Sequence, residues 1–193
     1  MAGRPAQFDE TAVLAKAAAL FWAKGYESTS SEELLEAMGM GKGSLYHAFG
    51  SKRALFEKVM DHFSHPALVS LKEALEAGKP PLEAIRAFFR SLASCPVDQM
   101  RNGCFMGNTL VELANTDEEL CTRAGTRLKK LERLFETLID EAKRAGQLRT
   151  TEDTAMLARY LITLWNGLNI TRRLYPDPKA LRPLIELQLK ILN

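Results

Sequence analysis

The sequence is poor in the residues on which catalysis, disulfide bonding and metal binding usually depend. Its 193 residues include three histidines and three cysteines, with no Cys-x-x-Cys pair, so neither a disulfide framework nor a zinc ribbon is expected. No Ser-His-Asp or Cys-His set can be recognised, which weighs against a hydrolase or transferase. His62 and His65 lie at helical spacing near Asp61, but without a third ligand they predict no metal site. No cofactor is expected.

Segments that could enter a membrane are also lacking. The longest run without a charge extends from Tyr160 to Thr171 and has 12 residues, which is shorter than a bilayer span. The N-terminus does not have the basic-then-apolar order of a signal peptide. We therefore expect a cytoplasmic protein with no membrane partner. Strand-type alternation and internal repeats are absent as well, so the chain is predicted to be all-α.

What the sequence does contain is enough apolar material for a core and one local cluster of positive charge. Hydrophobic residues make up 46% of the chain, which suits one domain or a small domain fused to a larger one. The net charge of +2 does not by itself indicate a nucleic-acid partner. Between residues 40 and 58, however, Lys42, Lys52, Arg53 and Lys58 stand against a single acidic residue, as binding to a DNA backbone would require.

That cluster overlaps a segment, residues 30–52, that predicts two short helices and the start of a third. Ser30 and Glu33 form the capping-box pattern, so the first helix should begin there and stop at Gly39. Lys42–Phe49 is long enough for two turns, with its large apolar residues on one side and polar residues on the other. This is typical of a helix-turn-helix, whose second helix enters the DNA major groove.

A set of residues in and around this segment occurs at a characteristic spacing: Phe21, Gly25-Tyr26, Thr29, Gly39–Phe49 and Ser51-Lys52. In this pattern the region resembles the N-terminal domain of the tetracycline-repressor family of bacterial transcription regulators. The resemblance implies an all-α fold of about nine helices. A three-helix DNA-binding domain would occupy residues 1–50, and an effector-binding and dimerisation domain residues 51–193. It also implies a dimeric, ligand-responsive regulator, most simply a repressor of a near-palindromic double-stranded DNA operator.

The same resemblance assigns roles to individual residues at the DNA. Tyr46, His47 and Lys52 would contact phosphates, Thr29 or Ser30 would add a contact from a helix start, and Lys42 and Ser44 would face base edges. Gly43 would allow close backbone approach, and Arg4 would lie in an N-terminal arm. Gly41 and Ala48 depart from the family pattern, which usually has a serine and a histidine or tyrosine there, so one phosphate contact fewer is expected.

The rest of the chain predicts further helices, the last of which carry apolar residues on more than one face. Helices are expected at about 9–24, 51–64, 66–78, 80–95, 103–114, 116–146, 151–175 and 179–192, with Thr116 capping the long one. The wide apolar faces of the last two suit a four-helix interface with a second copy. Its predicted residues are Leu157, Leu161, Leu164, Leu168, Leu181, Leu184, Ile185, Gln188 and Leu192.

A small-molecule effector of unknown identity should bind in the larger domain. A mostly apolar cavity with a few polar groups is expected, and its candidate lining residues are Phe63, Phe88, Phe89, Cys104, Phe105, Asn108, Trp165 and Asn169. Each could equally be part of an ordinary core.

Cys104 leads to a second hypothesis. Its surroundings, from Gly103 to Leu113, resemble a segment of the subgroup that includes the N-ethylmaleimide-reductase repressor, which implies a thiol that senses electrophiles and oxidants. A helix N-terminus and the nearby Arg101 would favour the thiolate, although a cysteine in an apolar helix is commonly a small buried hydrophobe. A third hypothesis is a helical interaction module or enzyme whose DNA-binding motif is vestigial.

Overall fold

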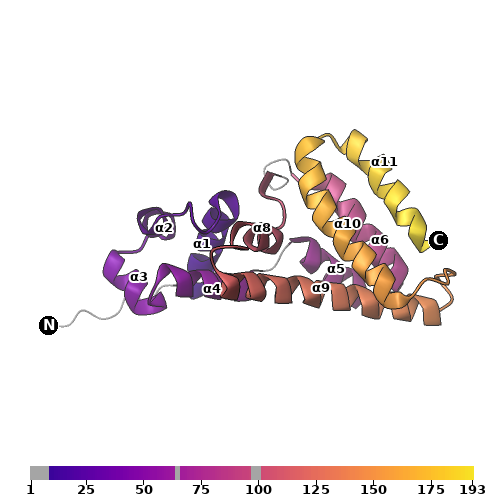
Figure 1. The fold of residues 1–193 in the computed structure, drawn as a ribbon, viewed down its shortest axis with the longest axis horizontal. Coiled ribbons are helices and arrows are strands. Elements are labelled where there is room, and N and C mark those ends of the chain that lie inside the picture. Colours follow the sequence, from indigo (N-terminus) through magenta and orange to yellow (C-terminus); the bar gives the residue numbers. More distant parts are fainter. Residues whose placement is uncertain (1–8, 64–65, 97–100) are drawn as a thin grey trace.

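The computed structural model describes residues 9–63, 66–96 and 101–193. Within these ranges every regular element is helical: ten α-helices and two short 3-10 helices. The prediction of an all-α fold is therefore confirmed, and the ten α-helices correspond to the ten helical ranges predicted above, close to the overall estimate of about nine. Figure 1 shows an elongated molecule in which α2 and α3 lie at one end and α10 and α11 at the other.

The first three helices form a compact unit. They are α1 (Glu10–Lys24), α2 (Ser31–Met38) and α3 (Lys42–Phe49), and their bounds agree with the predicted ones. Asp9 caps α1 by accepting a hydrogen bond from the Ala12 amide, and Ser30 and Glu33 cap α2 with a complete capping box. These local side-chain bonds satisfy amide groups that a helix start leaves unpaired, so the helix starts were readable from the sequence.

Helix α4 (Lys52–His62) joins this unit to the larger one. It packs against α1, where the rings of Phe56 and Phe21 meet edge to face with centroids 4.8 Å apart. Beyond it lie α5 (Pro66–Glu76), α6 (Pro81–Ser91), the 3-10 helix η1 (Leu92–Ser94) and α8 (Phe105–Glu112). The domain division after residue 50 remains a prediction, because the buried apolar residues on both sides of it form one continuous core.

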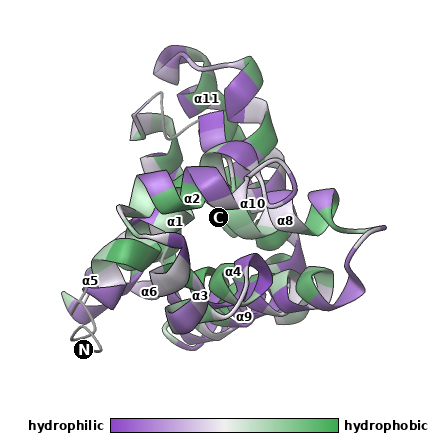
Figure 2. Ribbon diagram, turned by 90° about the vertical axis from the view of Figure 1, so that its left-hand side faces the viewer, coloured by the Kyte–Doolittle hydropathy of each residue, from purple (hydrophilic) through white to green (hydrophobic). Residues whose placement is uncertain are grey.

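The longest helix, α9 (Glu118–Arg144), runs beside α8, α6 and α10. Its cap is Asp117, whose carboxylate accepts the Leu120 amide at 3.0 Å, so the predicted cap at Thr116 was wrong by one residue. The chain ends with α10 (Thr154–Leu174), α11 (Pro178–Leu189) and the 3-10 helix η2 (Lys190–Leu192). Figure 2, which faces the end that carries α2 and α3, shows hydrophobic and hydrophilic residues together on each helix.

Candidate functional site

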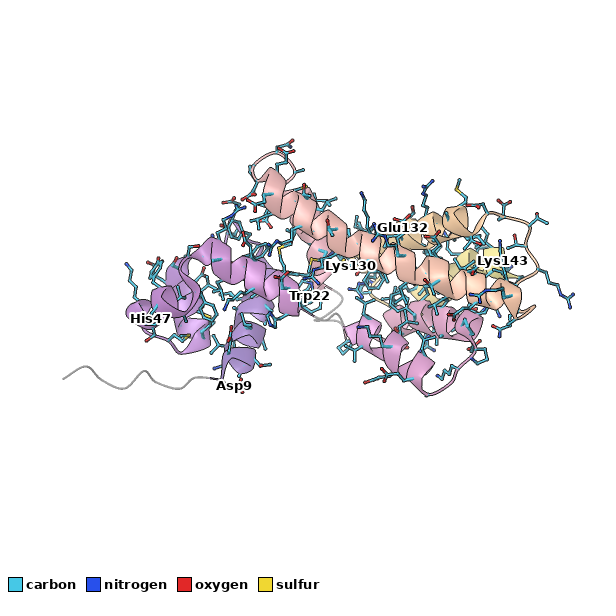
Figure 3. All side chains as sticks on the ribbon, turned by 90° about the horizontal axis from the view of Figure 1, so that it is seen from below. Asp9, Trp22, His47, Lys130, Glu132 and Lys143 are labelled. Carbon is cyan, nitrogen blue, oxygen red and sulfur yellow. The ribbon has the colours of Figure 1, made fainter. Side chains whose placement is uncertain are left out.

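The outer face of α3 is exposed, whereas its inner face packs in the core. Leu45 and Phe49 are 1% and 5% exposed and anchor the helix in the core, while Lys42, Ser44, Tyr46 and His47 are exposed. Figure 3 shows His47 at the far tip of the N-terminal unit. All four outward residues are those predicted to meet DNA.

The glycines around the start of α3 have no role that the fold itself requires. Among the residues that the structure describes, a β-carbon added at Gly41 or Gly43 would meet no atom within 4 Å, and neither backbone has a positive φ. Gly41 is the N-cap and provides no side-chain bond, as its departure from the family pattern predicted. Open space in front of Gly43 leaves room for another molecule to approach the backbone closely.

Only part of the basic cluster is available to an outside partner. Lys52 lies over the ring of Tyr26, with its ammonium 4.5 Å from the ring centroid, and no acidic partner occurs for it or for Lys42 in the described part of the chain. Arg53 instead bonds to three carboxylates of the protein itself, and Lys58 pairs with Glu10 at 2.9 Å. The positive surface is therefore smaller than the sequence count indicated.

The two predicted contacts at the start of α2 differ in their surroundings. Thr29 is 0% exposed, and its hydroxyl donates a hydrogen bond to the Gly25 carbonyl at 2.6 Å. It therefore stabilises the preceding turn. Contrary to the expectation of a DNA contact, its side chain does not face solvent. Ser30 is exposed and bonded to Glu33. Hydrogen bonds from Lys24 and then Ser30 lower the pKa of Glu33 to about 2. Arg4 lies outside the described residues.

A carboxylate that was not among the predicted site residues connects α8 to the turn after α1. Glu112, the last residue of α8, accepts hydrogen bonds from the backbone amides of Tyr26 at 3.1 Å and Glu27 at 2.9 Å. Its approach needs Gly25, because a side chain there would lie 2.7 Å from the Glu112 carboxylate. The only sequence signal for this contact is Gly25 itself.

A second connection runs from α4 to the start of α9. The Arg53 guanidinium bonds to the carboxylate of Asp117 and, at 2.7 Å, to that of Glu119. The Leu120 amide and then Arg53 lower the pKa of Asp117. One arginine thus joins the first turn of α4 to the cap of α9, although it was read as part of a DNA-facing cluster.

An apolar cavity of about 370 Å³ opens between α4, α5, α8, α9 and α10. Four predicted effector residues line it: Phe63, Cys104, Phe105 and Trp165. Its charged residues are Asp61, Lys72, Arg127 and Lys130. Since Arg127 already pairs with Asp61 at 2.5 Å, the two lysines give this otherwise apolar cavity a net positive charge.

The other predicted effector residues lie elsewhere. Phe88 and Phe89 are 2% and 0% exposed and pack around the ring of Phe135 in the core, so they line neither this cavity nor the next one. Asn108 and Asn169 line a separate cavity of about 510 Å³ on the side of α8 that faces α1. The sequence could not separate these sets, because core and cavity residues have the same helical periodicity.

Cys104 caps α8 and lies in the walls of both cavities. Its sulfur accepts the Gly107 amide at 3.4 Å, which is the favourable helix-terminus contact that was expected. Burial nevertheless dominates and raises the pKa of the Cys104 thiol, so the expected preference for the thiolate does not hold in this conformation. The buried guanidinium of Arg172 lies beside the thiols of Cys104 and Cys95.

Most residues predicted for the dimer interface are buried within a single copy of the protein. Leu157, Leu161, Leu164, Leu168, Leu181, Ile185 and Leu192 are between 0% and 8% exposed, so they have almost no surface left for a second copy. Leu184 and Gln188 are half-buried and border a shallow groove of about 210 Å³ between α10 and α11. Helices α10 and α11 carry apolar residues on two faces, and most of the residues predicted for the interface belong to the face that packs in the core.

The same two helices carry a second apolar surface, which we call the outer stripe. On α10 it consists of Met156, Thr163, Gly167, Ile170 and Leu174, spaced three, four or seven residues apart, and on α11 and η2 it continues through Leu184, Leu187, Gln188 and Ile191. Ile170 is 61% and Leu187 59% exposed. An apolar stripe of this kind is unusual on an isolated surface.

Two further sequence expectations concern absences. No helix of the described residues is long and apolar enough to cross a membrane. The described residues also contain no group of three or more potential metal ligands. His65, one member of the pair considered above, lies outside the described residues.

Comparison with known proteins finds related sequences over the whole length of the chain. Residues 13–59 match the family described as bacterial regulatory proteins, tetR family, and residues 81–187 match the tetracyclin repressor-like C-terminal domain. The chain is 31% identical over 193 residues to the uncharacterized HTH-type transcriptional regulator YezE of Bacillus subtilis, covering 99% of this chain and 100% of that protein. It is 30% identical to the HTH-type transcriptional repressor ComR of Escherichia coli, covering 89% and 82%.

Solved structures agree with the sequence matches. A cysteine-substituted form of the TetR family regulator CifR, bound to a 26-base-pair double-strand operator, has a TM-score of 0.81 at 27% identity, covering 99% of this chain and 100% of that chain. The reduced form of E. coli NemR has a TM-score of 0.78 at 21% identity, covering 94% and 96%. At 21% identity, the likeness to NemR shows a shared fold and nothing further.

Proposed function

The chain belongs to the TetR family of transcriptional regulators, which are not enzymes, and from this we propose that it is a dimeric repressor that a small-molecule effector releases from operator DNA. The observation that carries the proposal is the outer face of α3, where Lys42, Ser44, Tyr46 and His47 are exposed and have no packing role. The structure of CifR with operator DNA supports the assignment by analogy. The alternative of an interaction module or enzyme with a vestigial motif is set aside.

The proposed contacts divide into those that read sequence and those that hold the backbone. Lys42 and Ser44, in the first turn of α3, would face base edges in the major groove. Tyr46, His47 and Lys52 would bind phosphates, and Lys52 is positioned for this by its stack on Tyr26. Contacts to phosphate carry no sequence information, so the two groups have distinct tests.

A homodimer is proposed to form through the outer stripe. Two copies of α10 and α11 would then make a four-helix interface that covers Ile170 and Leu187. Gly167 supports this arrangement, because a β-carbon there would meet no atom of the described residues within 4 Å, and the lack of a side chain lets a second helix approach closely. A twofold dimer places two copies of α3 on one face, and the operator should therefore be a near-palindrome.

The effector is proposed to enter the cavity of about 370 Å³ that Phe63, Phe105 and Trp165 line. Phe105 begins α8 and Glu112 ends it, and the latter holds the turn between α1 and α2. An effector that displaces Phe105 would move α8 as a rigid rod and so change the position of the DNA-binding unit. The size of the response is limited by the difference in effector affinity between the two conformations.

Selection of duplexes from a random DNA pool at near-physiological salt tests the proposal. Recovery of an inverted repeat with a fixed half-site spacing is the expected result, and the duplex becomes the probe for effector tests. A variant in which Lys42 and Tyr46 are both alanine serves as the control, because their side chains are exposed and the fold should not change. Enrichment of the same repeat by this variant would show that α3 does not read the operator.

A second candidate function is electrophile sensing through Cys104, favoured by Arg172, whose positive charge lies beside the two thiols. An electrophilic alkene would form a sulfur–carbon bond while the thiol proton passes to the neighbouring carbon. Cys104 is only 7% exposed, so its sulfur would have to become more accessible before it reacts. Replacing Cys104 by serine should abolish release of DNA by N-ethylmaleimide, whereas replacing the half-buried Cys121 should not. Release that persists in the first variant would exclude this role.

A further inference from the structure

The cavity of about 510 Å³ lies where the DNA-binding unit meets the rest of the molecule. Its walls come from the end of α1, from α8 and from α10. It shares Cys104 and Leu128 with the effector cavity, so the two spaces lie on either side of the start of α8. Figure 3 shows Trp22, one of its wall residues, at the junction between the two parts of the molecule.

Two residues of this wall, Asn166 and Asn169, carry a buried amide oxygen that has no hydrogen-bond partner among the described residues. Asn169 is 2% exposed, and its Nδ2 donates to the Trp165 carbonyl at 2.7 Å. That bond determines the orientation of the amide, since only its nitrogen can donate, and Oδ1 is left unpaired. The Oδ1 atom of Asn166, one turn earlier, is likewise buried and unpaired. Buried acceptors of this kind are rare unless a donor arrives from elsewhere.

The charges around the cavity limit what that donor can be. Lys24, Arg101 and Arg173 line its walls, but Lys24 already pairs with Glu33. The two arginines then stand against Glu112, whose carboxylate already accepts two backbone amides. A cationic amine would be repelled by this balance. A carboxylate has only acceptor oxygens, so it could not donate a hydrogen bond to the oxygens of the two asparagines.

Most of the remaining wall is apolar, from Trp22, Leu110, Val111, Leu128 and Ile170, with Asn102 and Asn108 as further polar residues. An apolar body with a few convergent polar groups is the usual composition of a small-molecule site. We infer that this cavity is a second small-molecule site, distinct from the proposed effector cavity, and that it takes an uncharged compound with an apolar ring or chain and an N–H or O–H donor. The donor bonds to the Asn169 and Asn166 oxygens, and the apolar part contacts Trp22.

The chain offers a separate fluorescent reporter for each cavity. It has two tryptophans: Trp165 lines the effector cavity and Trp22 lines the second one. Replacing Trp165 by phenylalanine leaves Trp22 as the reporter of the second cavity. Replacing Trp22 by phenylalanine leaves Trp165 as the reporter of the first.

Benzamide and benzoate are suitable probes, because they share size and shape and differ in whether they donate a hydrogen bond or carry a charge. In the variant with Trp22 alone, benzamide should give a saturable change in fluorescence, and benzoate should bind at least fivefold more weakly. The full-length protein is used without DNA, so the result is independent of operator binding.

Replacing Asn169 by leucine tests the acceptor directly. The substitution removes the unpaired oxygen and keeps the branched shape of the side chain, and it should weaken benzamide binding at least fivefold while raising the melting temperature. Replacing Asn166 by leucine is the second test and should weaken binding in the same direction. A Trp22 signal that does not saturate, benzoate binding as tight as that of benzamide, or unchanged binding in both leucine variants would overturn the inference.

Discussion

Replacing Glu112 by alanine is expected to loosen the junction between the DNA-binding unit and α8. The carboxylate accepts two backbone amides, those of Tyr26 and Glu27, and these bonds span more than eighty residues of sequence. Hydrogen bonds to a charged group contribute roughly 1.5–3 kcal/mol each when water is excluded. The Glu27 amide is exposed, so water replaces most of that bond, and we expect a total cost of about 1.5–3 kcal/mol, mainly from the bond to the Tyr26 amide.

A substitution at Gly25, combined with the one at Glu112, separates the contribution of these hydrogen bonds to stability from other effects. Its backbone has φ 88° and ψ 171°, a region that is essentially restricted to glycine, so alanine there costs about 1–3 kcal/mol through strain. The new side chain would also lie 2.7 Å from the Glu112 carboxylate and displace it. Because either substitution breaks the same hydrogen bonds, the double variant should be less destabilised than the sum of the two by about 1.5–3 kcal/mol.

The assay is urea unfolding followed by circular dichroism, with all variants at one protein concentration because a dimer's stability depends on it. For a chain of this length, 1 kcal/mol corresponds to roughly 2–4 °C in melting temperature. Replacing Glu136 by alanine is the control, since it removes an exposed glutamate from the middle of α9. If the Glu112 variant matches this control to within about 0.3 kcal/mol and the cycle is additive, the carboxylate does not hold the junction.

Three further predictions concern DNA, assembly and pH. Replacing Lys52 by alanine should weaken binding to all duplexes and reduce the salt slope by about 1, whereas replacing Lys42 should change sequence preference; equal losses on every duplex from both would contradict this division. Replacing Ile170 by glutamate should give a monomer in analytical ultracentrifugation, while the same change at Val69, which is 40% exposed on α5, should not. The lowered pKa of Glu33, about 2, means that its contribution to stability is complete above the ordinary glutamate pKa and is lost as pH falls toward 2. Glutamine there should flatten the acid limb of the stability curve measured by urea unfolding, and an unchanged limb would show that the bonds to Glu33 do not stabilise the fold.

The elements of this protein follow largely from local signals. Ser30, Asp9 and Ser51 cap helices by bonds to amides three residues away, and glycines end α1, α2 and α3. These interactions act within one turn of helix, so short sequence patterns predict them. The outward residues of α3 were predictable for the same reason, since helical period alone separates them from Leu45 and Phe49.

The sequence by itself therefore determined an all-helical chain, most of its helix bounds and the face of α3 that meets solvent. Only the tertiary structure decided how distant residues meet: Thr29 turned inward, Arg53 bonded to Asp117, and Glu112 hydrogen-bonded to the turn after Gly25. It also decided which face of α10 fills the core and which remains as the outer stripe. The physical reason is that periodicity shows which residues share a helix face, whereas the partner of that face is chosen by packing between segments far apart in the chain.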